Sequence, residues 1–179
     1  MDKVRILDKE FKLFISEKQI QEAVELMARR MNKELKGKKV VFIGILNGCF
    51  MFAADLVRHL DLDCTITFLK LASYQGTSST GKVKQLIGLS EDIEGQVVVV
   101  LEDIVDTGIT LDFIQKQLRG YEPAEIKLAT LLYKPEACRQ DVALDYVGIE
   151  IPDDFVVGYG LDYNGCGRNL RQIYTVIKD

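Results

Sequence analysis

The residues with the clearest chemical potential lie between 97 and 111, in the segment VVVVLEDIVDTGITL. An apolar run there ends at two adjacent acids, Glu102 and Asp103, and the polar stretch DTGIT at 106–110 opens a predicted helix. The first backbone N–H groups of a helix have no partner within it, so they can bind a phosphate. The two acids would repel a free phosphate, but they suit ribose hydroxyls or an Mg²⁺ ion shared with the substrate. The segment therefore predicts a site for a phosphorylated sugar.

Individual residues of the turn support this interpretation. The hydroxyls of Thr107 and Thr110 add hydrogen-bond donors, and Gly108 lets the backbone approach a ligand closely. The alternative is that Asp106 or Thr107 only caps a helix while the two acids are solvated, but the full pattern favours the ligand site. No G-x-x-x-x-G-K-[ST] motif occurs, and the glycines of GYGLDYNGCG at 158–167 lack the dinucleotide-binding spacing. Kinase and dehydrogenase functions therefore have no support in the sequence.

Composition narrows the class of protein. The chain has 179 residues, of which 47% are hydrophobic and 28% charged, so it can bury one core without disulfides or a structural metal. A formal net charge of -4 and the lack of a basic cluster argue against nucleic-acid binding. The N-terminus has no signal-peptide pattern, and no apolar run has the length of a bilayer span. We predict a single cytoplasmic domain over 1–179, with no membrane or nucleic-acid partner and with reduced thiols at Cys49, Cys64, Cys138 and Cys166.

Helix and strand patterns alternate along the chain. Ser16 and Gln19 match a capping box, and the runs VVFIGIL and VVVVL have the continuous apolar character of strands buried on both faces. The predicted helices span 17–35, 50–60 and 110–118, and the predicted strands span 40–46, 65–71, 97–101 and 126–133. The last third offers short β-rich pieces. We predict an α/β fold with a mostly parallel twisted sheet flanked by helices, which binds its ligand beyond the carboxyl ends of the strands.

The apolar run, the two acids and D-T-G-x-T resemble the phosphoribosyl-pyrophosphate motif of type I phosphoribosyltransferases. Further motifs occur in the order found in the hypoxanthine phosphoribosyltransferases of that family, namely LNG at 46–48, SYQGTSSTG at 73–81, Lys134, IPDDFVVGYGLDYN at 151–164 and Arg168. The resemblance spans nearly the whole chain. It implies purine salvage, with Mg²⁺-dependent transfer of the 5-phosphoribosyl group from phosphoribosyl pyrophosphate to hypoxanthine and also to guanine. It further implies a small β-rich hood built from the termini, mainly from about 146–179.

The resemblance also implies roles on the sugar-phosphate side of the site. Asp106 resembles the catalytic acid/base, which exchanges a proton with one imidazole nitrogen of the purine while the glycosidic bond forms at the other. Glu102 and Asp103 correspond to acids that hold the ribose hydroxyls, directly or through Mg²⁺, and that favour positive charge at the anomeric carbon. The residues expected to bind the phosphoribosyl group are Glu102, Asp103, Asp106, Thr107, Gly108, Ile109 and Thr110.

The purine would be held by residues further along the chain. Lys134 resembles the lysine that donates to the six-oxo group and so selects oxopurines over adenine, although a lysine at a strand end is commonly solvated. Phe155 resembles the aromatic residue that stacks on the base, with a core position as the alternative. Val156 would add backbone contacts, and Asp162 resembles a metal-coordinating carboxylate near the base and the pyrophosphate. The Mg²⁺ ligands implied are Glu102, Asp103 and Asp162.

Pyrophosphate would be bound by two segments. The residues Leu46, Asn47 and Gly48 would expose backbone amides to it, and relatives often have a cis peptide there, whereas the alternative is a plain Asn-Gly turn. Arg168 resembles the residue that grips pyrophosphate with a bidentate guanidinium. A surface ion pair is the alternative for both Arg168 and Asp162.

The chain also contains a predicted lid and departs from the family at two positions. Ser73 and Tyr74 resemble the start of a mobile lid that keeps water from the reactive sugar cation. Asn47 stands where relatives commonly carry lysine and Ile109 where some of them do, so both remove positive charge near phosphate groups. The remaining alternatives are a related transferase that prefers xanthine or another base, and a nucleotide-sensing RNA-binding regulator. A homodimer or homotetramer is expected, because relatives form such assemblies.

Overall fold

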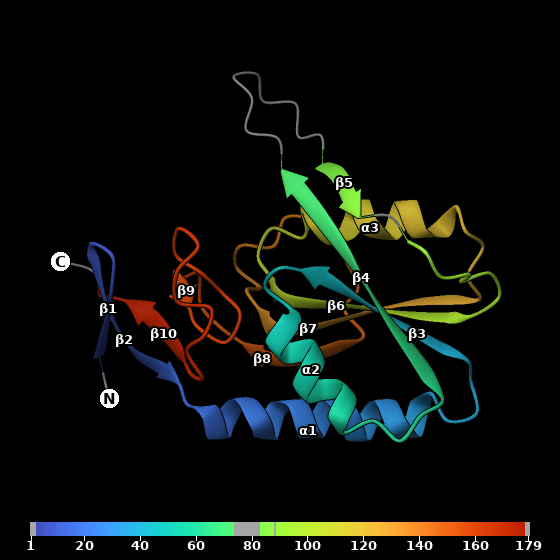
Figure 1. Ribbon diagram of the computed structural model, residues 1–179, viewed down its shortest axis with the longest axis horizontal. Helices are drawn as coiled ribbons and strands as arrows, with labels where there is room; N and C mark the ends of the chain where they lie inside the picture. The colour runs from blue at the N-terminus through green and yellow to red at the C-terminus, as the bar shows by residue number, and fades with distance from the viewer. Residues whose placement is uncertain (1–2, 74–82, 88, 178–179) are drawn as a thin grey trace.

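A six-stranded sheet forms the centre of the protein in the computed structural model, which describes residues 3–73, 83–87 and 89–177 (Figure 1). The strand order is β5-β4-β3-β6-β7-β8. All neighbours pair in parallel except β5, which is antiparallel to β4. The strands are β3 (Val40–Leu46), β4 (Cys64–Ser73), β5 (Val83–Ile87), β6 (Val97–Val105), β7 (Glu125–Tyr133) and β8 (Tyr146–Glu150). The predicted α/β class and mostly parallel sheet are confirmed.

The two central strands are the apolar runs that the sequence marks as buried on both faces. In β3 all residues before Leu46 are buried, and in β6 the run from Val97 to Glu102 is buried. The strand β6 continues to Val105, four residues beyond the predicted end, because Val105 still pairs with Tyr133 of β7. Glu102 and Asp103 therefore lie within a paired strand, where the backbone fixes their directions.

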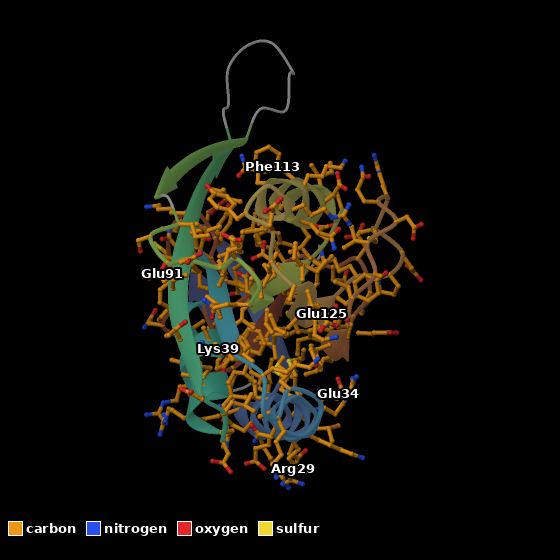
Figure 2. The ribbon with its side chains drawn as sticks, turned by 90° about the vertical axis from the view of Figure 1, so that its right-hand side faces the viewer. Arg29, Glu34, Lys39, Glu91, Phe113 and Glu125 are labelled. Carbon is orange, nitrogen blue, oxygen red and sulfur yellow. The ribbon has the colours of Figure 1, made fainter. Side chains whose placement is uncertain are left out.

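Helices cover both faces of this sheet. The helices α1 (Glu17–Glu34) and α2 (Phe50–Arg58) pack on one face, and α3 (Ile109–Arg119) packs on the other. Figure 2 shows Glu34 of α1 and Phe113 of α3 on opposite sides of the sheet. The predicted capping box is present, since the Ser16 side chain accepts from the Gln19 N–H and the Ser16 N–H donates to the Gln19 side chain. No helix of the described residues has both the length and the apolar character needed to cross a membrane.

A second, antiparallel sheet forms the hood, with the order β1-β2-β10-β9. Its strands are β1 (Lys3–Ile6), β2 (Lys9–Ile15), β9 (Val156–Val157) and β10 (Ile173–Val176). The N-terminal strands β1 and β2 form a hairpin that no sequence pattern had assigned. The residues 146–150, which the prediction places in the hood, instead form β8 of the main sheet, because Tyr146 is fully buried and pairs with Ala129 of β7.

Candidate active site

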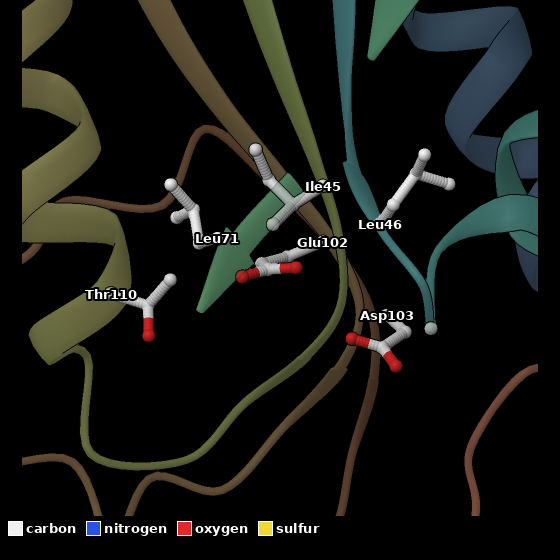
Figure 3. Close-up of a pocket in the computed structure, with 7 residues that line it drawn as sticks. Ile45, Leu46, Leu71, Glu102, Asp103 and Thr110 are labelled. Carbon is white, nitrogen blue, oxygen red and sulfur yellow. The ribbon is translucent and has the colours of Figure 1, made fainter. Parts of the chain in front are cut away.

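A cavity of about 240 Å³ lies at the carboxyl ends of β3 and β6 (Figure 3). It is lined by Ile45, Leu46, Gly48, Leu71, Glu102, Asp103 and Thr110. In Figure 3 Glu102 is directed toward the side of Thr110 and Asp103 toward the turn after β3, as expected for successive residues of one strand. A smaller hollow of about 90 Å³ shares Glu102 and Thr110 and is otherwise lined by Ile104, Val105, Asp106, Thr107, Gly108 and Leu111. The acids and the helix start predicted to hold one ligand thus border adjoining spaces.

Burial of the acid pair Glu102 and Asp103 disfavours their ionised forms. Glu102 is only 7% exposed, and burial, together with the charge of Asp103, raises its pKa well above the usual value. Burial also raises the pKa of Asp103 to about 6, although the Ile104 N–H, which donates to its Oδ1 at 2.9 Å, and the Arg168 guanidinium oppose the rise. A pair of carboxylates strained in this way favours a partner that brings hydroxyl donors or positive charge.

The helix α3 begins without a side-chain cap. Its N-cap is Gly108, which has a φ of 80° and forms no side-chain cap, so the alternative that Asp106 or Thr107 caps the helix is wrong. The first helical residue, Ile109, is 51% exposed and leaves this end of the helix without a cation at that position. A neighbouring loop supports the turn, because the Arg139 N–H donates to the Thr107 carbonyl oxygen at 3.1 Å. The first N–H groups of the helix, which have no partner within it, are thus not occupied by a side-chain cap.

The backbone of the turn after β3 packs directly against the Asp103 carboxylate. The peptide bond between Leu46 and Asn47 is cis, as the resemblance implied. A Cβ atom at Gly48 would collide with the Asp103 carboxylate, and one at Gly160 would collide with the Gly48 carbonyl oxygen. Only glycine therefore allows the turn, the acid pair and the loop around Gly160 to meet.

Lys134 is a buried cation between two carboxylates. It is only 6% exposed, so the alternative of a solvated lysine is wrong. Its Nζ atom lies 3.5 Å from Asp106 Oδ2 and 3.1 Å from Asp153 Oδ1. Its backbone N–H donates to the Val105 carbonyl oxygen at 2.9 Å, which fixes the end of β7 beside the end of β6. Lys134 thus joins the predicted acid/base to the segment that carries the predicted stacking residue.

Phe155 lies on the hood with nearly half of its surface exposed. The side chain is 46% exposed, so it is not a core residue, whereas Val156 is buried. Its ring contacts Tyr163 edge-on with centroids 5.9 Å apart, and Phe11 at 6.4 Å. The Phe155 carbonyl oxygen accepts from the Val176 N–H at 3.1 Å, which ties the segment to β10. The ring is held in place while one side stays open, as stacking on a planar ligand requires.

Asp162 and Arg168 form the ion pair that the sequence left as an alternative. The Arg168 Nη2 atom lies 2.6 Å from Asp162 Oδ1, and its Nη1 atom donates to the Gly160 carbonyl oxygen at 2.6 Å. Each side chain is 29% exposed, and both charges act on the pKa of Asp103. The residues that the structure describes contain no cluster of three acidic, histidine or cysteine side chains suited to a metal. The implied Mg²⁺ ligands Glu102, Asp103 and Asp162 stay a prediction; Asp162 is paired with Arg168, and its Oδ2 atom also accepts from the Gly165 N–H at 2.6 Å.

Most of the predicted lid lies outside the described residues, and two residues at the site were not predicted from the sequence. Ser73 ends β4, whereas Tyr74 and the rest of the predicted lid lie outside the described residues. Sequence reasoning missed Ile104, which lines the smaller hollow beside Asp106 but has the pattern of an ordinary strand residue. It also missed Gly160, whose close contact with the turn after β3 only the fold reveals.

Comparisons with known proteins agree with this arrangement. Residues 15–164 match the phosphoribosyl transferase domain family. Hypoxanthine-guanine phosphoribosyltransferases from Staphylococcus epidermidis and Staphylococcus aureus are 41% and 39% identical over 165 residues, which is 92% of this chain and of each relative. The solved structure of a hypoxanthine-guanine phosphoribosyltransferase from Bacillus anthracis has a TM-score of 0.87 and 42% identity, and covers 93% of this chain and 97% of its own.

A hypoxanthine phosphoribosyltransferase from Trypanosoma cruzi, solved in a ternary complex with substrates, has a TM-score of 0.86 at 36% identity and covers 92% of this chain and 94% of its own. Fold, site and sequence thus point the same way. The chain belongs to the hypoxanthine-guanine phosphoribosyltransferases, within the phosphoribosyl transferase domain family.

Proposed function

We propose that the protein transfers the 5-phosphoribosyl group of phosphoribosyl pyrophosphate to hypoxanthine or guanine, with release of pyrophosphate. The observation that carries this proposal is the contact of the buried Lys134 with the half-exposed Asp106, beside the acid pair and the start of α3. A cation and a carboxylate held together at the edge of a sugar-phosphate site can recognise both the oxo group and the imidazole edge of a purine. Substrates and activity of this class belong to purine salvage.

The reaction assigns a separate task to each part of the site. The N9 atom of the base forms a bond to the anomeric carbon, and the bond from that carbon to the pyrophosphate oxygen breaks, so the electron pair leaves with pyrophosphate. The proton on N7 passes to the Asp106 carboxylate, which balances the charge on the nucleotide formed. Glu102 and Asp103 hold the ribose hydroxyls, and their negative charge favours the positive charge that develops at the anomeric carbon.

The donor set fits an Mg²⁺ ion that is shared with the substrate. Mg²⁺ is commonly bound by one or two carboxylates together with substrate phosphates, and Glu102 and Asp103 are two buried carboxylates on one cavity. When bound, the ion would neutralise charge on the pyrophosphate. The family resemblance supports this use of the acid pair, while Asp162 would act through Arg168.

Recognition of the base rests on Lys134 and Phe155. A lysine Nζ can donate to a six-oxo group but cannot accept from the amino group of adenine, so oxopurines are preferred. Its two carboxylate neighbours, Asp106 and Asp153, accept from the lysine Nζ and so hold its direction. The open ring of Phe155 supplies the stacking surface, and the Val156 backbone the edge contacts.

A panel of bases tests the proposal. Hypoxanthine, guanine, xanthine, adenine and uracil are each incubated with phosphoribosyl pyrophosphate and Mg²⁺, and nucleotide formation is followed by absorbance. We expect turnover with hypoxanthine and guanine, and none that is comparable with adenine or uracil. A preference for xanthine would indicate the related transferase instead. No product from any purine, with salt-dependent binding of RNA, would point to the regulator and reject the enzyme. We expect a homodimer or homotetramer in solution, which sedimentation can test.

A further inference from the structure

Tyr159 is a buried tyrosine that connects the hood to the main domain. It lies between Gly158 and Gly160, has a φ of 50° and is only 2% exposed. Its hydroxyl donates to Asp55 Oδ2 at 2.6 Å, across 104 positions of the sequence. Burial, and then the bond to Asp55, raises the pKa of the tyrosine, so the hydroxyl remains a donor at physiological pH. This buried hydrogen bond therefore holds the loop at 158–160 against α2.

The acceptor, Asp55, binds groups from two other elements and one from its own helix at a single carboxylate. It lies on α2, and the Gln21 side chain of α1 donates to the same Oδ2 atom at 2.8 Å. The Arg58 guanidinium lies 3.6 Å from its other oxygen. The carboxylate is therefore held from the side of the helices, and the tyrosine hydroxyl is the group that the hood contributes. The hydrogen bond from Tyr159 thus ties the 158–160 loop to the helices α1 and α2.

The residue that follows Tyr159 contacts both predicted pyrophosphate-binding elements. The Gly160 α-carbon packs on the Gly48 carbonyl so closely that no Cβ would fit. The Gly160 carbonyl oxygen accepts from Arg168 Nη1 at 2.6 Å, and its N–H donates to the Arg168 carbonyl oxygen at 2.9 Å. A shift of Tyr159 would therefore move the Gly48 turn and the Arg168 guanidinium together.

We infer that Tyr159 and Asp55 are positioning residues for the pyrophosphate side of the site, acting through Gly160 on Gly48 and Arg168. The inference rests on the proposed function, because it concerns the leaving group of that reaction. Neither side chain lines the cavities at the acid pair or at α3, so neither acts on the sugar or the base directly. The pair sets the geometry in which pyrophosphate is gripped and leaves the base pocket unchanged.

A matched pair of tyrosine variants separates this role from simple stabilisation of the fold. Tyr146 is also a buried tyrosine whose hydroxyl donates to a carboxylate on a helix, Glu34 Oε2 at 2.8 Å, and burial likewise raises its pKa. It lies in β8, away from the turn after β3 and from Arg168. Tyr159→Phe and Tyr146→Phe each remove one oxygen and keep the ring, so they delete equivalent bonds at different places.

Two ligands report on the two halves of the site. Pyrophosphate with Mg²⁺ occupies only the side under test, whereas inosine monophosphate occupies the base, ribose and 5′-phosphate positions. For Tyr159→Phe we expect the inhibition constant of pyrophosphate and the KM of phosphoribosyl pyrophosphate to rise about 10-fold, as for loss of a hydrogen bond to a charged group. The dissociation constant of inosine monophosphate should change less than about 2-fold. Tyr146→Phe should leave all three of these constants unchanged, even if its melting temperature falls as far as that of Tyr159→Phe.

A double-mutant cycle gives a second, independent check. Asp55→Asn keeps an acceptor for the tyrosine but weakens it, so it should raise the inhibition constant of pyrophosphate less than Tyr159→Phe does. The double variant should bind pyrophosphate no more weakly than Tyr159→Phe alone. Equal effects of the two tyrosine variants, additive effects in the cycle, or equal weakening of pyrophosphate and inosine monophosphate would overturn the inference. Failure of the wild-type protein to form nucleotide would instead reject the proposed function, which the same assays reveal first.

Discussion

Replacing Asp103 with asparagine should make the protein more stable at neutral and alkaline pH while lowering its activity. Burial raises the pKa of this carboxyl from its usual 3.8 to about 6. At about 1.36 kcal/mol per pKa unit, the ionised carboxylate lowers the free energy of unfolding by about 3 kcal/mol. Asparagine removes the charge but retains the Oδ1 atom, which can still accept the Ile104 N–H bond. The substitution would thus remove both the destabilising negative charge and the carboxylate that the proposed reaction uses.

The pH dependence of this gain follows from which state binds the proton more tightly. With a raised pKa, the folded protein keeps the Asp103 proton to a higher pH than the unfolded chain does. The destabilisation is therefore absent below about pH 3.8, develops between about 3.8 and about 6, and is constant above. We expect Asp103→Asn to raise the free energy of unfolding by about 3 kcal/mol at pH 8, and by less than about 1 kcal/mol at pH 4. Glu102 adds to the gain at pH 8, because the Asp103 charge also raises its pKa.

Urea denaturation followed by circular dichroism measures this difference at the two pH values. Asp112→Asn is the control, because Asp112 lies on α3 in a surface ion pair with Lys116 at 2.7 Å, and its loss should change stability by less than about 1 kcal/mol at either pH. Nucleotide formation from hypoxanthine is measured on the same samples. Equal gains for Asp103→Asn at pH 4 and pH 8, or a loss of stability at pH 8, would refute the reasoning.

Three further substitutions test separate parts of the site. Asp106→Asn should retain nucleotide binding but lower turnover about 100-fold, the usual scale for a lost acid/base, and steady-state kinetics with unchanged kcat would contradict the role. Lys134→Gln should lower the ratio of kcat/KM for hypoxanthine over adenine at least about 10-fold, because glutamine can accept as well as donate; an unaltered ratio would remove lysine from base selection. Ile109→Lys places a cation on an exposed residue at the start of α3 and should lower the KM of phosphoribosyl pyrophosphate several-fold, an effect that added salt reduces; a salt-independent change would point to another cause.

The sequence alone predicted the parts of the fold whose burial is continuous. The run VVFIGIL became β3 with the predicted bounds, and the acids after VVVVL lie where the ligand site was expected. The length of β6 was not predictable, since pairing of its last residues depends on Tyr133 of a later strand. The hairpin of β1 and β2 was not predicted for a similar reason, because its buried Phe11 packs on the distant residues Val157 and Tyr174.

The predicted chemistry at single positions depended on contacts that spacing does not encode. Lys134 and Phe155 were assigned through a resemblance, and their roles stay predictions. The structure gives the buried lysine two carboxylate partners and leaves the phenylalanine ring nearly half exposed, neither of which spacing reveals. Asp162 was assigned as a metal ligand through the resemblance, and its ion pair with Arg168, whose guanidinium also donates to the Gly160 carbonyl oxygen, was foreseen only as an alternative. Such pairings are set by tertiary packing, so the identity of a side chain does not reveal which partner it meets.

The balance of charge around the site explains why a cation should enter with the substrate. The charged side chains of the described site are the carboxylates Glu102, Asp103, Asp106, Asp153 and Asp162 and the cations Lys134 and Arg168. Both cations are already paired, and Asn47 and Ile109 contribute no charge. An incoming pyrophosphate group would therefore meet a surplus of negative charge, which hydrogen bonds from backbone amides do not remove. We propose that a divalent cation bound together with the substrate would reduce the repulsion between pyrophosphate and the acid pair, and would offset the free energy that burial of those acids costs.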